Sequence, residues 1–314
     1  MHAFRGAASI LRWDSAVMMP RGSSDLRGEQ LAALETEAHA LLISPRVSRL
    51  LDRADANVQA LEDWQAANLR EMRRERDHAI ATPESVVSRL AKATSRAEVK
   101  WSEARQKSDF ALFAPHLEEV INLMRDKASL LGKALNLDPY DALADEFSPG
   151  LRSEEIDSIL TAIGRRLPGL IHETIELQAR RPPLEITGKF STAKQRQLAL
   201  EVMKAMGFPF ERGRLDESEH PFTGGVPGDI RITARFSNTD PLTGLMGILH
   251  ETGHAMYDMQ LPESWRGQPV GRDRGMAVQE SQSLLLEMLI CRNRPFLHYL
   301  KPLLEKAFGL SGPE

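Results

Sequence analysis

The amino-acid sequence predicts a mainly α-helical protein with a small β element beside one of its helices. Apolar residues recur at steps of three and four along most of the first 180 residues, which is the spacing of an amphipathic helix. One stretch, residues 229–236, instead alternates apolar and polar side chains as a strand does. The motif HETGH, residues 250–254, follows that strand within a further helical pattern.

The N-terminal half is predicted to consist of successive helices. In residues 25–43 the side chains Leu31, Leu34 and Ala38 share one helical face, and charged side chains occupy the other. Further helices are predicted at residues 59–80, 82–107, 115–134 and 153–180. Thr82 and Pro83 are typical of a helix cap followed by proline at the first helical position.

A joint between two subdomains is predicted near the middle of the chain. Residues 179–190 contain paired prolines, which are expected to end the preceding helix. We therefore expect a helical N-terminal subdomain, residues 1–185, and a metal-binding catalytic subdomain, residues 186–314.

The C-terminal half is predicted to begin with a helix at residues 192–206, followed by a loop-rich stretch and the strand at 229–236. Asp240 and Pro241 are typical of a helix start, so the helix with HETGH is expected to run from there towards Pro262. A last helix is predicted at residues 275–292, ending before Pro295.

The composition argues against several classes of protein. The net charge is −4 and the charges are interspersed, so no nucleic-acid-binding surface is expected. Apolar runs are too short for a membrane span, and the first residues lack the apolar core of a signal peptide. Cys291 is the only cysteine, so a reducing, cytoplasmic location is the simplest interpretation.

The HETGH motif predicts a metal site with its own general base. His250 and His254 are four residues apart and share one helical face, where two neutral ring nitrogens can bind one ion. Glu251 lies beside them and can take the proton from a water that the ion activates. Gly253, between the histidines, allows another backbone to approach closely. The alternative is a pair of structural histidines.

A catalytic zinc site needs a third protein ligand, and the residues leave several candidates open. These are the carboxylates that follow the motif: Asp258, Glu263, Asp273, Glu280 and Glu287. Glu280 comes 26 residues after His254 in a second predicted helix, a spacing that suits zinc sites completed by a glutamate from the next helix.

The strand before the motif predicts a second role for this region. In zinc peptidases of this kind an edge strand commonly pairs with an extended peptide substrate. Arg231 and Thr233 lie on the polar face of the predicted strand, and an arginine suits the capture of a carboxylate. An ordinary solvated strand face is the alternative.

Several motifs in a fixed order resemble the carboxypeptidase Taq family, the M32 metallocarboxypeptidases. They are WDSAVMMP (13–20), HPF (220–222), DIRIT (229–233), HETGHA (250–255) and ESQ (280–282). The resemblance implies an elongated helical gluzincin-type metallopeptidase fold with a small β element beside the HExxH helix. It also implies a deep groove, one wall of which residues 1–185 form, removal of C-terminal amino acids from peptides, and a homodimer.

The resemblance also implies roles for individual residues. His250, His254 and Glu280 match the family's metal ligands, and Glu251 matches its catalytic base. His220, Arg231 and Thr233 match positions associated with the substrate groove. The cofactor implied is one divalent metal ion, zinc in the first place with cobalt and manganese as alternatives, and the partners implied are peptide substrates.

Two departures from the family pattern stand out. Gln279 occupies the place of a histidine that usually precedes the third-ligand glutamate; glutamine keeps hydrogen-bonding capacity but cannot act as a cation or proton shuttle. In addition, motifs that the family carries later have no counterpart before Glu314. We therefore expect the chain to lack the C-terminal part of the family fold.

Two other functions stay open at the level of the sequence. HExxH spacing fits an endo-oligopeptidase of the same metal class equally well. A metal-binding helical protein without catalytic activity is the other alternative, because segments that help to build the groove are missing.

Overall fold

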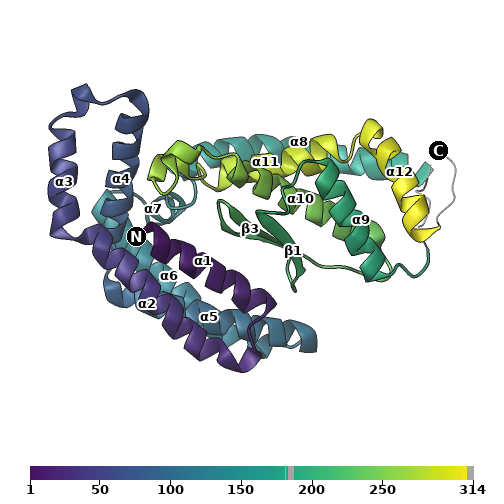
Figure 1. Ribbon diagram of the computed structural model, residues 1–314, viewed down its shortest axis with the longest axis horizontal. Coiled ribbons are helices and arrows are strands. Elements are labelled where there is room, and N and C mark those ends of the chain that lie inside the picture. The colour runs from purple at the N-terminus through teal and green to yellow at the C-terminus, as the bar shows by residue number, and fades with distance from the viewer. Residues whose placement is uncertain (181, 183–186, 310–314) are drawn as a thin grey trace.

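The computed structural model describes residues 1–180, 182 and 187–309 of the chain (Figure 1). The N-terminal half is helical throughout, as the apolar periodicity predicted. Its helices are α1 (His2–Val17), α2 (Ser24–Ile43), α3 (Pro45–Asp55), α4 (Asp63–Ala81), α5 (Glu84–Lys107), α6 (Ala114–Leu135), α7 (Pro139–Ala144) and α8 (Ser153–Arg180).

The predicted N-terminal helices are confirmed with small shifts at their ends. The helix predicted at 59–80 begins at Asp63, where Glu62 and Gln65 form a reciprocal capping box. Thr82 is the C-cap of α4, and Pro83 is the N-cap of α5 with a ψ of 146°. The expected assignment of Pro83 to the first helical position was therefore wrong, because its ψ is extended rather than helical.

The C-terminal half surrounds a small sheet. It contains α9 (Thr192–Ala205), α10 (Pro241–Met259), α11 (Met276–Leu284), a π-helical segment (Leu285–Ile290) and α12 (Arg294–Phe308). Within the described residues the sheet has three strands, β1 (Gly213–Glu217), β2 (Thr223–Val226) and β3 (Asp229–Ala234).

The predicted strand lies in the centre of the sheet. β3 pairs in parallel with β1 and antiparallel with β2, so both of its hydrogen-bonding edges are occupied. The expectation that a peptide adds to this strand as to an edge strand is therefore wrong for β3. The sequence pattern missed β1 and β2 because they are short and contain Gly213, Gly224 and Gly225, which interrupt any apolar alternation.

The helix with HETGH forms as predicted, whereas the last predicted helix is divided. Asp240 caps α10 by accepting hydrogen bonds from the backbone N–H groups of Leu242 and Thr243. The segment predicted as one helix at 275–292 is α11 followed by the π-helical segment. Pro295 lies in the first turn of α12, where a missing N–H costs nothing, so it begins a helix instead of limiting one.

The core of the C-terminal half fixes α10 against the sheet and α9. Ile232 of β3, Ile248 and Leu249 of α10 and Met203 of α9 are fully buried in one apolar cluster. Cys291 belongs to the same cluster, and burial raises the pKa of its thiol to about 11. One face of α10 is thus held in the core, which leaves its other side to α11.

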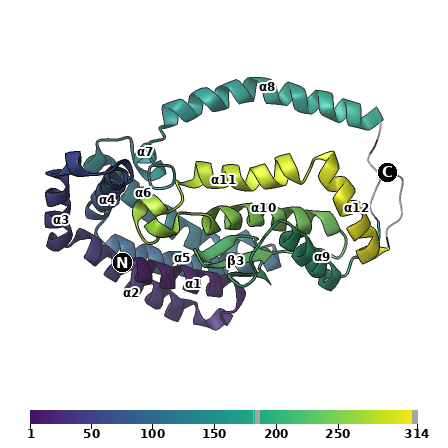
Figure 2. The same ribbon diagram turned by 45° about the horizontal axis from the view of Figure 1, so that its top comes forward.

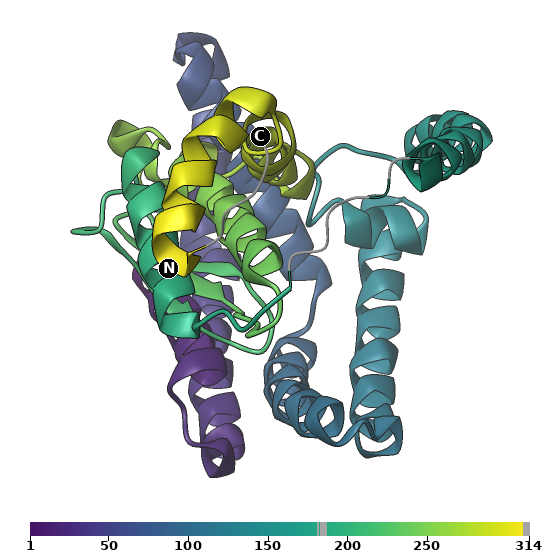
Figure 3. The same ribbon diagram turned by 90° about the vertical axis from the view of Figure 1, so that its right-hand side faces the viewer.

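The molecule is elongated, and α1 connects its two halves. Ser9 of α1 donates a hydrogen bond to the carbonyl oxygen of Gly225 in β2 (2.6 Å), so the N-terminal helix packs on the sheet edge. Figures 2 and 3 show α8 standing apart from the other helices, and this helix buries none of its residues in the described part of the chain. Five of the twelve residues of the predicted joint at 179–190, namely 181 and 183–186, lie outside the described residues.

No helix in the described ranges is both long and apolar enough to cross a lipid bilayer.

Candidate metal centre

Two histidines of α10 and one glutamate of α11 converge on a single point. Figure 1 shows the two helices side by side. The Nε2 atom of His250 lies 3.6 Å from Glu280 Oε1, and that of His254 lies 3.4 Å from Glu280 Oε2. Ligands about 2.1 Å from a tetrahedral zinc are about 3.4 Å from one another. The separations of Glu280 from the two histidines therefore match those around one divalent ion, and the three ligand atoms all lie within 4.8 Å of one another.

The Nδ1 atoms of both histidines have hydrogen-bond acceptors that fix the ring orientation. His250 Nδ1 lies 3.0 Å from Glu287 Oε2, and His254 Nδ1 lies 3.1 Å from Gln279 Oε1. Because a carboxylate oxygen and an amide oxygen only accept, both Nδ1 atoms carry the proton. The Nε2 lone pairs are then free to face Glu280, as ligation of a metal requires.

Gln279 connects His254 to a second carboxylate. Its amide nitrogen donates to Asp258 Oδ1 at 2.8 Å while its amide oxygen accepts from the histidine. Burial raises the pKa of Asp258 to about 6, and the hydrogen bond from Gln279 opposes that rise. The glutamine that departs from the family pattern thus keeps an orienting contact to the histidine ring.

Glu287 is the orienting partner of His250 and is not one of the converging ligands. Burial alone would raise the pKa of Glu287, but hydrogen bonds from Arg292 and His250 outweigh it and hold the pKa below its usual value. Glu287 is one of the five carboxylates that the sequence left open as the third metal ligand. In the structure its carboxylate contacts Nδ1 of His250 and not Nε2.

Glu251 directly follows His250 in α10 and is 8% exposed. The hydroxyl of Thr223, in β2, lies 2.8 Å from both the Oε2 atom and the backbone oxygen of Glu251. The hydroxyl has one proton to donate to these two oxygens, and the contact ties Glu251 to the sheet. Sequence reasoning missed Thr223, because nothing in the local pattern indicates that β2 reaches α10.

Gly253 allows α11 to lie directly against α10, as its place between the histidines predicted. A Cβ atom at Gly253 would lie 2.6 Å from the Cα of Ser283 and 2.8 Å from the carbonyl oxygen of Gln282. Backbone atoms cannot move aside as a flexible side chain can. The separation of the two helices, and with it the reach of Glu280 to the histidines, depends on this glycine.

We expect Gly253→Ala to lower the free energy of unfolding by about 3 kcal/mol, the upper end of the usual cost of overpacking. Zinc affinity should fall as well, because the new methyl group moves α11 and Glu280 away from the histidines. Urea unfolding of the metal-free protein and zinc titration measure the two effects. Gly247→Ala is the matched control, since no atom lies within 4 Å of a Cβ at that position of α10. Equal behaviour of the two variants would contradict this explanation.

The two residues of β3 that were expected to contact substrate are already engaged within the protein. Arg231 forms two contacts with Asp229, at 3.0 and 2.8 Å, and its guanidinium lies 4.4 Å from the centre of the Trp13 ring. Thr233 is fully buried, and its hydroxyl accepts from Ser218 and from the backbone N–H of Phe222. Thr233 therefore fixes the 218–222 loop and does not face solvent.

His220 lies at a different hollow from the converging ligands. The hollow has a volume of about 810 Å³ and its lining includes His220, Phe222, Arg235 and Trp101, with none of the three converging ligands. His220 itself is exposed, and its backbone oxygen accepts a hydrogen bond from Ser218. The structure thus brings together His250, His254 and Glu280, whereas His220 lines this other hollow.

The chain is similar to known metallopeptidases over nearly its whole described length. The family model of the carboxypeptidase Taq (M32) metallopeptidases matches residues 1–313. Thermostable carboxypeptidase 1 of Thermus thermophilus is 34% identical and is aligned over 97% of this chain and 62% of its own. Carboxypeptidase 1 of Bacillus subtilis is 31% identical and is aligned over 92% of this chain and 58% of its own. The solved structure of Trypanosoma cruzi metallocarboxypeptidase 1 matches with a TM-score of 0.87 and 37% identity over 99% of this chain and 62% of that one.

The chain spans about three fifths of the length of these relatives. Within that span the agreement extends over both halves of the chain and is not confined to HETGH. The family that the sequence motifs predicted is confirmed: the chain belongs to the carboxypeptidase Taq (M32) family of metallopeptidases.

Proposed function

We propose that this protein is a metal-dependent carboxypeptidase that releases C-terminal amino acids from peptides. The observation that carries the proposal is the convergence of His250 Nε2, His254 Nε2 and Glu280, in a helix where Glu251 directly follows His250. Zinc is the proposed ion, because two imidazoles and one carboxylate are a common catalytic zinc set; cobalt and manganese are the alternatives.

Metal binding, proton transfer and orientation of the ligands are assigned to different residues. A divalent ion held by His250, His254 and Glu280 would polarise the scissile carbonyl and lower the pKa of water. Glu251 takes the proton of the attacking water and afterwards delivers it to the leaving amine. Glu287 and Gln279 keep the two imidazoles in the tautomer that faces the ion.

Removal of a C-terminal residue also needs a group that holds the free carboxylate. Arg231 is proposed for this role, with His220 as a further contact to the peptide and Thr233 as the residue that positions the 218–222 loop. The proposal includes a cytoplasmic setting, since the single cysteine forms no disulfide. The homodimer rests on the family resemblance.

The proposal is tested with the purified 314-residue chain, zinc or cobalt, and paired peptides that differ only in a free or an amidated C-terminus. We expect single amino acids to be released from the free peptides and the amidated peptides to stay intact. Cleavage of the amidated peptides would identify an endo-oligopeptidase. Metal binding without cleavage of either would identify a metal-binding protein without activity.

A further inference from the structure

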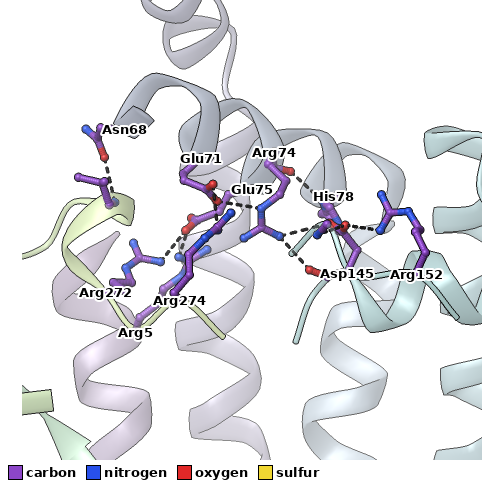
Figure 4. Close-up of polar contacts among 12 residues, drawn as sticks. Arg5, Asn68, Glu71, Arg74, Glu75, His78, Asp145, Arg152, Arg272 and Arg274 are labelled. Atoms are coloured by element: carbon purple, nitrogen blue, oxygen red, sulfur yellow. Dashed lines mark hydrogen bonds and ion pairs between the residues drawn. The ribbon is translucent and has the colours of Figure 1, made fainter. Parts of the chain in front are cut away.

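The loop between the two metal-site helices is fastened to a helix of the other half of the molecule. Residues 260–275 join α10, which carries both histidines, to α11, which carries Glu280. Their regular structure consists of two short 3₁₀ turns, Glu263–Trp265 and Pro269–Gly271. Figure 4 shows this loop lying along α4, with its polar groups directed at that helix.

Part of the attachment is formed by a buried amide and an aromatic pair. Asn68 of α4 is 7% exposed; its side-chain oxygen accepts from the backbone N–H of Val270 (3.1 Å) and its nitrogen donates to Gln268 (3.2 Å). Trp265 of the loop stacks on Trp64 of α4 with ring centres 5.9 Å apart. These contacts fix the position of the loop along the axis of α4.

Charged side chains form the rest of the attachment. Glu75 of α4 pairs with Arg272 of the loop at 2.7 Å and with Arg5 of α1 at 2.9 Å (Figure 4). One turn earlier, Glu71 pairs with Arg274 at 3.0 Å. Glu75 and Arg272 are 15% and 29% exposed, so this pair is more shielded from water than an ordinary surface pair, whereas Arg274 is 55% exposed.

The attachment continues to the segment that meets the start of α11. Arg74 of α4 donates to the backbone oxygen of Asp145, whose carboxylate also accepts from Arg152 (Figure 4). Two residues further on, the carbonyl oxygen of Phe147 accepts from the backbone N–H of Met276, the first residue of α11, at 2.6 Å. The N-terminus of α11 is thus fixed from the loop and from α7.

The position of Glu280 depends on how α11 is held against α10, to which the loop contributes together with the contacts of Gln279 to His254 and Asp258. Glu280 lies just beyond the first turn of α11, and its side chain is 46% exposed. In the described chain, Ser283 is the one residue of α11 that is buried. The position of Glu280 relative to the histidines therefore follows from where the loop and the contact at Gly253 place α11.

We infer that Glu71 and Glu75 of α4, with Arg272 and Arg274 of the loop, form a clamp that positions Glu280 for metal binding. These four are positioning residues and do not contact the ion. The inference rests on the proposed metal centre. It assigns to the N-terminal helices a part in the metal site, which they reach through the loop between α10 and α11.

The test is a double-mutant cycle on zinc affinity with Glu75→Gln, Arg272→Gln and the double variant. Each single change breaks the ion pair between Glu75 and Arg272, although Glu75 still pairs with Arg5 when only Arg272 is replaced. We expect each to weaken zinc binding about tenfold. The double variant should be no weaker than the single ones, because the two sites are coupled. The absorption spectrum of bound Co²⁺ in the single variants should move towards that of Glu280→Ala. A purely structural role would not produce this change.

Arg73→Gln is the matched control, since Arg73 lies on α4 but pairs with Asp52 and Asp55 of α3. The clamp is refuted if Glu75→Gln binds zinc within about twofold of the wild type with an unchanged Co²⁺ spectrum, or if Arg73→Gln weakens binding as much. If Glu280→Ala binds zinc like the wild type, the ligand set is wrong and the clamp is refuted with it. A loss in Glu280→Ala without a loss in Glu75→Gln refutes the clamp alone.

Discussion

Glu251→Gln is expected to bind zinc nearly as well as the wild type and to hydrolyse peptides about 10²–10⁴-fold more slowly, the usual contribution of a positioned acid–base group. Glutamine has the size of glutamate and keeps an oxygen that accepts the hydrogen bond from Thr223. It cannot take up a proton. The substitution therefore removes the proposed proton transfer and leaves the three metal ligands in place.

The measurement pairs kcat on a peptide with a free C-terminus with a zinc affinity from competition against a chelator. Glu201→Gln is the matched control, because Glu201 is an exposed glutamate of α9 and lies outside the site. Hydrolysis by Glu251→Gln within about threefold of the wild type would exclude Glu251 as the base. A parallel loss of zinc would instead show that the substitution disturbs the ligands.

The features that could be predicted from sequence are those set by local periodicity and capping. Helices α2, α6 and α8 follow from their apolar spacing, and the start of α10 follows from Asp240 and Pro241. The two histidines could be paired because residues four apart share a helix face at any position in a fold. The first part of the site is therefore a property of one helix.

The remaining part depends on how helices meet, which spacing does not determine. Five carboxylates followed the motif, and Glu280 was favoured over the others by the family resemblance. In the structure Glu280 reaches the histidines because α11 packs closely on α10, where Gly253 lies against Ser283. Thr223 and Glu287 could not be assigned for the same reason, since each reaches the site from another element.

The β element shows a second limit of the sequence pattern. Of the strand predicted at residues 229–236, residues 229–234 form β3, but alternation cannot tell an edge strand from a central one. Because β1 and β2 occupy both sides of β3, Thr233 is buried and Arg231 is held by Asp229 and Trp13. Residues that resembled a free binding face are in part supports of the sheet and of the 218–222 loop.

Glu280→Ala is expected to weaken zinc binding by on the order of 10²–10³-fold. Structural zinc sites bind with about 10–16 kcal/mol shared by four ligands, so one ligand accounts for roughly 2.5–4 kcal/mol. The Nε2 atoms of His250 and His254 would keep their orientation, because Glu287 and Gln279 hold the two rings. Residual binding by two imidazoles should therefore persist.

Glu287→Ala provides the matched comparison, since it removes a carboxylate of the same type that contacts His250 without facing the ion. Loss of an orienting partner typically costs about 10–100-fold in metal affinity, less than loss of a ligand. At the same pH, Glu287→Ala should therefore bind zinc more tightly than Glu280→Ala. The reverse order would make Glu287 the ligand and Glu280 its support. Equal affinities near the wild type would mean that neither carboxylate completes the site.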